Sequence, residues 1–160
     1  MVMGKNNNGL LTYLNNRIFT ICLNRPKNYN TLTFEILETL IDIFKTISEN
    51  PQIDVVIIKN IGKAFSTGHD LKEIKRQNNQ NYLNELFETC SRMMQIIQEL
   101  PQPVIAQISG ITTAAGCQLV ATADLALATT ESTFATNGIN NGLFCATPAV
   151  ALSRNVGRKK

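Results

Sequence analysis

The chain has 160 residues, of which 44% are hydrophobic, and a formal net charge of +3 at pH 7. A chain of this length can bury one hydrophobic core, which predicts a single domain. The basic residues between positions 154 and 160 form a short solvated tail, and no basic stripe interleaved with aromatic residues indicates nucleic-acid binding. The longest apolar runs are too short to span a bilayer.

The cysteines and the N-terminal segment bear on where the protein works. The four cysteines are far apart and include no CxxC pair, which predicts reduced, mostly buried thiols in an intracellular protein and indicates neither a zinc site nor a disulfide framework. Residues 1–9 lack the apolar run of a signal peptide, and Lys5 is their single basic residue, whereas a mitochondrial transit segment usually carries several arginines. We predict a disordered lead-in over residues 1–9 and one domain over residues 10–160.

The N-terminal third alternates apolar runs with turn-forming residues. Two apolar runs flank Asn15 and Asn16, which predicts a β-hairpin with a two-residue turn at these asparagines. A polar loop around Pro26 follows. Thr33 is the expected N-cap of an amphipathic helix, whose apolar residues recur at helical spacing and which ends before Pro51.

The middle of the chain contains a strand and a long helix. Residues 55–58 are a continuous β-branched run, which predicts a strand buried on both faces of a sheet. The asparagine-rich residues 76–81 are expected to be mobile. A long helix is predicted over residues 83–100, with methionines that fill the core, and Pro101 and Pro103 end it.

The last third repeats the alternation of strands and helices. Residues 104–108 and 124–128 are predicted as a second and a third buried strand, and residues 133–135 as a short fourth. Thr147, followed by proline, suits the N-cap of a last helix that reaches Val156. Strands that alternate with helices predict an α/β fold with right-handed crossovers between parallel strands.

Two segments rich in small residues each follow a strand-like run and precede a helix. Residues 62–74 read GKAFSTGHDLKEI, and residues 108–119 read ISGITTAAGCQL. A strand that breaks at small residues and restarts as a helix leaves free N–H groups, which suit an anion or a developing oxyanion. Tight packing of a strand-to-helix turn, without any ligand, is the alternative explanation of the small residues.

Together the two segments resemble the enoyl-CoA hydratase/isomerase (crotonase) superfamily, whose pattern is AF-x-x-G-x-D-L/I-K-E followed by G-x-x-x-G-G-G-C-x-L. The resemblance begins near Leu10 and reaches the last residue. It implies a crotonase (ClpP/crotonase-like) fold of repeated ββα units and an acyl-CoA ligand. It implies no metal and no separate cofactor, since coenzyme A is part of the substrate.

The resemblance also bears on assembly and location. Family members form homotrimers or hexamers and continue beyond the length of this chain, with helices that complete the acyl pocket. We therefore expect that the C-terminal helical part is missing here, which puts the assembly in doubt. The family implies a mitochondrial protein of fatty acid metabolism, while the absence of a clear transit segment in residues 1–9 leaves a cytoplasmic location open.

By motif position, the resemblance implies an oxyanion hole made by the backbone amides of His69 and Ala115. Two preorganised amides stabilise the charge that builds on a thioester carbonyl oxygen when an enolate forms. Asp70 is expected to cap the helix that begins after it. The remaining residues expected at the CoA site are Lys27, Thr67, Gly68, Leu71 and Lys72. The two lysines resemble those that meet CoA phosphates, and solvated surface charges are the alternative explanation for them.

The chain departs from the family at the two glutamates that hydratases use to move protons. Gln118 occupies the first position, and its amide has no proton to exchange near neutral pH. Gly138 occupies the second and has no side chain. The ring of His69, the single histidine, is an alternative acid or base because histidine titrates near neutral pH.

The expected function is therefore acyl-CoA thioester binding by a hydratase-like (lyase-like) family member, and whether it is an enzyme stays open. Within the enzyme class, isomerisation, decarboxylation or thioester hydrolysis at the same oxyanion hole remain alternatives to hydration. Outside it, the alternative is a non-catalytic protein that binds acyl-CoA or joins a relative in a mixed oligomer.

Overall fold

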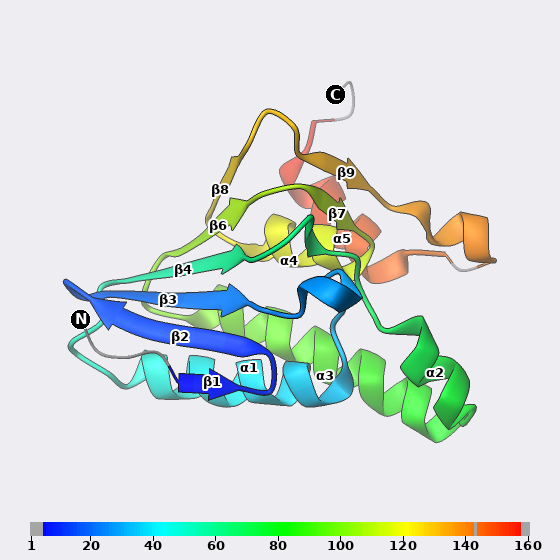
Figure 1. The fold of residues 1–160 in the computed structure, drawn as a ribbon, viewed down its shortest axis with the longest axis horizontal. Coiled ribbons are helices and arrows are strands. Elements are labelled where there is room, and N and C mark those ends of the chain that lie inside the picture. The colour runs from blue at the N-terminus through cyan, green and yellow to red at the C-terminus, as the bar shows by residue number, and fades with distance from the viewer. Residues whose placement is uncertain (1–4, 143, 158–160) are drawn as a thin grey trace.

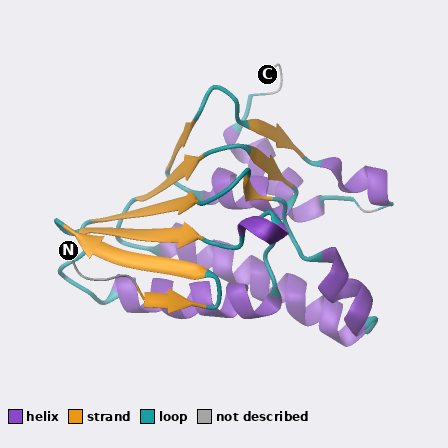
Figure 2. Cartoon of the chain, in the orientation of Figure 1, coloured by secondary structure: helices purple, strands orange, loops and turns teal. Residues whose placement is uncertain are grey.

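The computed structural model describes residues 5–142 and 144–157, which form an α/β fold with two sheets (Figures 1 and 2). The strands are β1 (Lys5–Asn7), β2 (Leu10–Asn15), β3 (Ile18–Leu23), β4 (Val55–Asn60), β5 (Ala64–Ser66), β6 (Val104–Ile108), β7 (Ile111–Thr113), β8 (Leu125–Ala128) and β9 (Thr133–Ala135). The α-helices are α1 (Phe34–Ser48), α2 (Leu71–Gln77), α3 (Gln80–Glu99), α4 (Ala115–Thr122) and α5 (Ala146–Asn155). Two short 3₁₀ helices are η1 (Pro26–Asn28) and η2 (Asn137–Asn141).

The larger sheet has the strand order β1-β2-β3-β4-β6-β8. β1, β2 and β3 pair antiparallel, whereas β3, β4, β6 and β8 pair parallel. Helices α1 and α3 lie against each other along this sheet (Figure 1). Parallel strands with helical connections confirm the predicted fold class, because a parallel pair needs a crossover long enough to hold a helix.

The N-terminal hairpin turns one residue later than predicted, at Asn16 and Arg17. Both residues have positive φ, 47° and 65°, which matches the two-residue turns that fit the twist of paired strands. Asn15 is therefore the last residue of β2. Lys5–Asn7, part of the segment predicted to be disordered, pairs as β1 with the unpaired edge of β2, while residues 1–4 lie outside the described residues.

The hydrophobic core lies between the larger sheet and the helices α1 and α3. Leu37 and Phe44 of α1 are fully buried there, together with Leu86 and Met93 of α3. Thr33 caps α1 as predicted, since its side chain accepts a hydrogen bond from the backbone N–H of Ile36 at 3.3 Å. The amphipathic patterns of both helices thus correspond to faces that the structure buries.

Three strands that were predicted to be buried leave part of their surface uncovered. In β6, Gln107 is exposed and Ile105 is half-buried. In β4, Val56 and Ile58 are buried, whereas Val55 and Ile57 are only half-buried. All four residues of β8, Leu125–Ala128, are exposed. The prediction was wrong because an apolar run does not reveal which faces of a strand another layer will cover, and β8 is an edge strand.

The smaller sheet contains β5, β7 and β9, all parallel. β9 confirms the predicted fourth strand, whereas the sequence did not indicate β5 and β7, because the glycines and small residues around them are typical of a turn. Both missed strands lie inside the two segments of small residues. None of the helices in the described ranges is long and apolar enough to cross a membrane.

Candidate functional site

The two segments of small residues meet at one edge of the smaller sheet. β5 and β7 are neighbouring parallel strands, and each leads through a short loop to the start of a helix, α2 or α4. Gly68 lies where the loops touch and has φ +85°. A Cβ atom at this position would be 3.0 Å from the backbone nitrogen of Ala115 and 3.0 Å from the Cβ of Ala114, so glycine permits this close approach.

This contact brings the backbone amides of His69 and Ala115 to the same region. Ala115 is the first residue of α4, so its N–H has no acceptor within the helix. Over residues 5–142 and 144–157, neither amide donates a hydrogen bond to a protein acceptor. Two free amides beside a helix N-terminus can stabilise negative charge on a bound oxygen.

Asp70 holds the first loop in shape. Its carboxylate accepts hydrogen bonds from the backbone N–H groups of Lys72 at 3.0 Å and Glu73 at 3.3 Å, which confirms the predicted cap of α2. The second oxygen accepts from the hydroxyl of Thr31 at 3.1 Å and lies 3.8 Å from the Arg25 guanidinium. The loop that carries His69 is thereby tied to the polar loop after β3.

The second loop is fixed by an unusual backbone conformation. Ala114 has φ +49° and ψ −121°, a region that residues with a Cβ rarely occupy, and its N–H donates to the carbonyl of Ala135 at 3.0 Å. Gly116 faces the Ser66 carbonyl so closely that a Cβ would clash with it. Helix α4 consequently starts directly against β5 and cannot move away without breaking these contacts.

His69 and Ala115, the residues that carry the two amides, both line a pocket of about 710 Å³. Of the residues expected at the CoA site, Gly68 does not line this pocket because it lies in the contact between the loops. Hydrophobic side chains from several elements form one part of the wall: Leu71, Ile74, Phe87, Ile111, Phe144 and Pro148. The expected CoA-site residues that line it are Lys27, Thr67, Asp70, Leu71 and Lys72.

The ring of His69 packs edge-on against Phe87, with 5.1 Å between ring centroids and an interplanar angle of 84°. Its Nδ1 is buried without a hydrogen-bond partner among the described residues. Burial lowers the pKa of His69 to about 4, against a smaller opposing effect from the backbone of Leu32. The ring is therefore neutral at pH 7 and a weak base there.

Only one of the two positions of the missing glutamates lines the pocket. Gly138, in η2, lines the pocket, whereas Gln118 is 6% exposed and does not line it. The side-chain oxygen of Gln118 accepts a hydrogen bond from the hydroxyl of Thr147 at 2.9 Å, and Thr147 does line the pocket. The prediction of Thr147 as an N-cap was wrong, since α5 begins at Ala146 and has no side-chain cap.

Sequence reasoning missed this role of Thr147. The two bonded residues are 29 positions apart, and no local pattern links them. The capping preference of threonine accounts equally well for its place before a proline. Only the packing of α5 on α4 brings the hydroxyl to Gln118.

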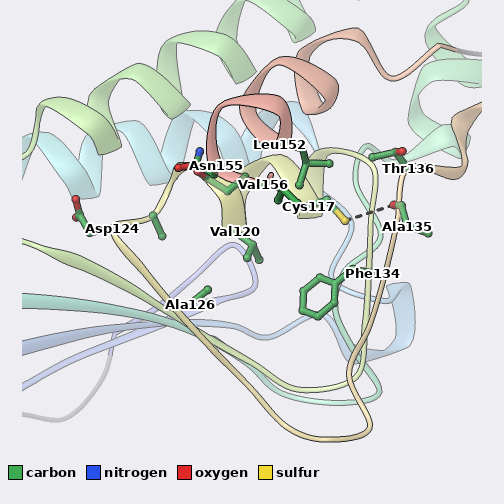
Figure 3. A pocket seen from close by; sticks show the side chains of 12 residues that line it. Cys117, Val120, Asp124, Ala126, Phe134, Ala135, Thr136, Leu152, Asn155 and Val156 are labelled. Carbon is green, nitrogen blue, oxygen red and sulfur yellow. Dashed lines mark hydrogen bonds between the residues drawn. The ribbon is translucent and has the colours of Figure 1, made fainter. Parts of the chain in front are cut away.

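A second pocket of about 540 Å³ is lined by residues of α4, α5, β8 and β9 and of the loops beside them (Figure 3). Its wall is largely apolar, and none of the predicted site residues lines it. The polar groups of Asp124 and Asn155 are already engaged, by the N–H of Val104 at 2.7 Å and by the carbonyls of Ala121 and Ala151 at 2.9 Å. The candidate site is therefore the pocket that holds the two free amides.

Comparison with known proteins agrees with this fold. The model of the family described as enoyl-CoA hydratase/isomerase matches residues 14–160. Enoyl-CoA hydratase domain-containing protein 3, mitochondrial, from Danio rerio is 48% identical over 149 residues, which are 93% of this chain and 52% of that protein. The Homo sapiens protein of the same name is 46% identical over 142 residues, 89% of this chain and 47% of that protein.

Solved structures show the same relationship. The crystal structure of an enoyl-CoA hydratase from Mycobacterium smegmatis superposes with a TM-score of 0.92 at 49% identity and covers 96% of this chain and 60% of that one. The human enoyl-CoA hydratase domain-containing protein 3 superposes with a TM-score of 0.91 at 44% identity, over 95% of this chain and 60% of that one. The fold is thus the predicted crotonase fold, and the chain belongs to the enoyl-CoA hydratase/isomerase family. It spans about half the length of the curated relatives it matches.

Proposed function

We propose that this chain binds acyl-CoA thioesters and polarises the thioester carbonyl with the amides of His69 and Ala115. The observation that carries the proposal is the contact of Gly68 with the Ala115 backbone, which brings two unpaired amides to one pocket. Removing one such donor in other enzymes costs roughly 3 kcal/mol of transition-state stabilisation. The apolar part of the pocket wall suits an acyl chain.

Lys27 and Lys72 supply positive charge at the same pocket and are our candidates for contact with the phosphates of CoA. Ammonium groups at such a position attract a polyanionic nucleotide, and salt screens this attraction when the charges are exposed. An acyl-CoA that joins an apolar chain to a charged nucleotide matches the two kinds of residue in the wall.

Hydration of an enoyl thioester is not the reaction that this site favours. It needs one group to take a proton from water and another to deliver a proton to carbon. The amide of Gln118 exchanges no proton, Gly138 has no side chain, and the His69 ring is neutral with a pKa of about 4. These residues favour the second candidate function, a non-catalytic acyl-CoA-binding protein or a subunit that joins a relative in a mixed oligomer.

The names of the two related proteins quoted above include "mitochondrial". We extend a mitochondrial location and a role in fatty acid metabolism to this chain as part of the proposal. Among enzymatic alternatives, the oxyanion hole itself is compatible with isomerisation, decarboxylation or thioester hydrolysis, since all of these develop charge on the carbonyl oxygen.

Calorimetric titration with butyryl-CoA at increasing salt tests the binding site. We expect measurable affinity that weakens as salt rises, and Lys72→Ala should lower both the affinity and the salt dependence. Lys45→Ala, on the exposed face of α1, is the matched control and should leave both unchanged. Absence of binding, or affinity that does not depend on salt, would overturn the assignment.

Turnover of crotonyl-CoA tests the catalytic part of the proposal. General acid–base catalysis is worth about 10²–10⁴-fold in rate, so hydration should be negligible beside that of an ordinary hydratase. Gln118→Glu combined with Gly138→Glu should raise the rate. Efficient hydration by the unmodified chain would contradict the proposal, and His69→Gln, which keeps the amide and removes the ring, would then identify or exclude the ring as the base.

A further inference from the structure

Asparagine is followed directly by glycine at three places in the chain, residues 8–9, 137–138 and 141–142. An asparagine in this position is prone to deamidation, because glycine has no Cβ to hinder attack by its backbone nitrogen on the asparagine side chain. The reaction proceeds most readily where that nitrogen and the side-chain amide are both free of other hydrogen bonds. The three places differ in this respect.

Two of the three places are held by hydrogen bonds. Asn8 lies in the turn between β1 and β2, and its side-chain amide donates to the hydroxyl of Thr39 at 3.5 Å. The backbone nitrogen of Gly142 donates to the carbonyl of Ile139 at 3.1 Å. The first pair therefore has an engaged side-chain amide, and the pair at residues 141–142 has an engaged nucleophile.

Asn137 and Gly138 are the first two residues of η2, and both reacting groups are free there. The side chain of Asn137 is exposed and forms no hydrogen bond with the described residues. The N–H of Gly138 has no acceptor among them either, because a helix leaves its first N–H groups unpaired. The next residue, Ile139, is 76% exposed, so little packing opposes a local opening of η2.

We propose that Asn137 is a site of spontaneous deamidation whose product weakens acyl-CoA binding in the candidate pocket. The backbone nitrogen of Gly138 loses its proton and bonds to the side-chain carbonyl carbon of Asn137, and the side-chain nitrogen leaves as ammonia with that proton. Water then adds to one of the two carbonyls of the resulting succinimide ring and opens it. The product is aspartate or isoaspartate, and either one carries a carboxylate.

The location of Asn137 gives this modification a consequence for the ligand. Asn137 lines the candidate pocket, whose wall also includes Lys27 and Lys72. A polyanionic ligand is attracted by the two lysines and repelled by the new carboxylate, so deamidation lowers its affinity. This effect on binding rests on the proposed function, whereas the modification itself does not.

Incubation of the purified chain at mildly alkaline pH in heavy-oxygen water, followed by peptide mapping with tandem mass spectrometry, tests the modification. Heavy oxygen labels each asparagine that reacts, and we expect residue 137 to acquire the label several-fold faster than residues 8 and 141. Incubation in urea, where the structure protects none of the pairs, should bring the three rates together. Gly138→Ala, which adds a Cβ beside the attacking nitrogen, should slow labelling of residue 137 and leave that of residue 8 unchanged.

Calorimetric titration with butyryl-CoA tests the effect on binding. Asn137→Asp should lower the affinity by roughly 2–5-fold, the size expected for one interaction between exposed charges. Asn140→Asp adds the same charge to η2 at a residue that does not line the pocket. It is the matched control and should change the affinity less.

Equal labelling of the three asparagines in the folded chain would overturn the inference, and so would a preference for residue 137 that persists in urea. Equal affinities of Asn137→Asp and the unmodified chain for butyryl-CoA would overturn the effect on binding. Failure of the unmodified chain to bind butyryl-CoA would overturn the proposed function and this effect with it, while preferential labelling of residue 137 would still establish the modification.

Discussion

The region formed by strands β2 to β6 with α1 and α3 and the region formed by β8, β9 and α5 use apolar side chains differently. In the first region, Leu37 and Phe44 are fully buried. In the second, Leu125, Leu127 and Phe134 are 60%, 64% and 50% exposed. An apolar strand thus becomes core only where a second layer of structure packs on it, and α1 and α3 provide that layer for the first region.

The candidate pocket draws its wall from both regions. His69 and Phe87 come from the elements around the first core, whereas Thr147 comes from α5 of the second region and Gly138 from η2, which follows β9 in the chain. The free amides are consequently held by tightly packed loops, while other parts of the pocket wall lie on elements with less buried surface. Each of the following changes tests this division.

The largest effect should come from the first core. Phe44→Ala removes a fully buried ring, and the lost contacts and the resulting cavity should lower the free energy of unfolding by about 3–5 kcal/mol. Urea denaturation followed by circular dichroism measures this. Leu127→Ala in β8 is the counterpart and should change the free energy of unfolding by about 0.5 kcal/mol or less. Equal losses in the two variants would show that the division is mistaken.

A somewhat smaller effect on the free energy of unfolding is expected at acidic pH. The pKa of His69 is lowered by burial to about 4 in the folded chain, so on acidification the unfolded chain takes up a proton first. The stability that this neutral ring contributes is complete above pH 6.5 and falls by roughly 3 kcal/mol as the pH drops to 4.

Urea denaturation between pH 7 and 4 measures this loss. His69→Phe, which cannot titrate, should lose less stability than the wild type over that range, and the difference between the two isolates the ring from the carboxylates. Parallel pH curves for the two proteins would contradict the lowered pKa.

The strained loop of the oxyanion hole predicts a gain in stability. Ala114 has φ +49°, and backbone strain of this kind costs of the order of 1–3 kcal/mol. Ala114→Gly should therefore raise the free energy of unfolding by about 1 kcal/mol, after allowance for the flexibility of glycine in the unfolded chain. Ala121→Gly, inside the same helix, is the control and should lower it by a similar amount. A loss in both variants would argue against the strain.

The smallest effect on folding, with a clear effect on association, is expected in the second region. Exposed apolar patches favour self-association, so the chain should be poorly soluble or oligomeric at high concentration. Leu125→Ser with Leu127→Ser should reduce association while leaving the unfolding midpoint nearly unchanged. Sedimentation velocity measures the self-association. A wild-type chain that stays monomeric and unfolds in one sharp transition would contradict this expectation.

Several features were determined by the sequence alone. Helices α1 and α3, strands β6 and β9 and the caps formed by Thr33 and Asp70 follow from periodicity and local hydrogen bonding, which act within a few residues. The two segments of small residues and the substitutions at Gln118 and Gly138 are likewise readable from the chain, and they are what led to the family and to the doubt about hydration.

Other features were decided only by the tertiary structure. Strands β5 and β7 lie among glycines and small residues that are typical of turns, and they form because each pairs with distant residues. The exposure of β8 depends on which elements pack on it, and no local pattern contains that information. The bond between Thr147 and Gln118 arises because α5 packs against α4, so a residue with a strong local preference for capping serves a partner 29 positions away.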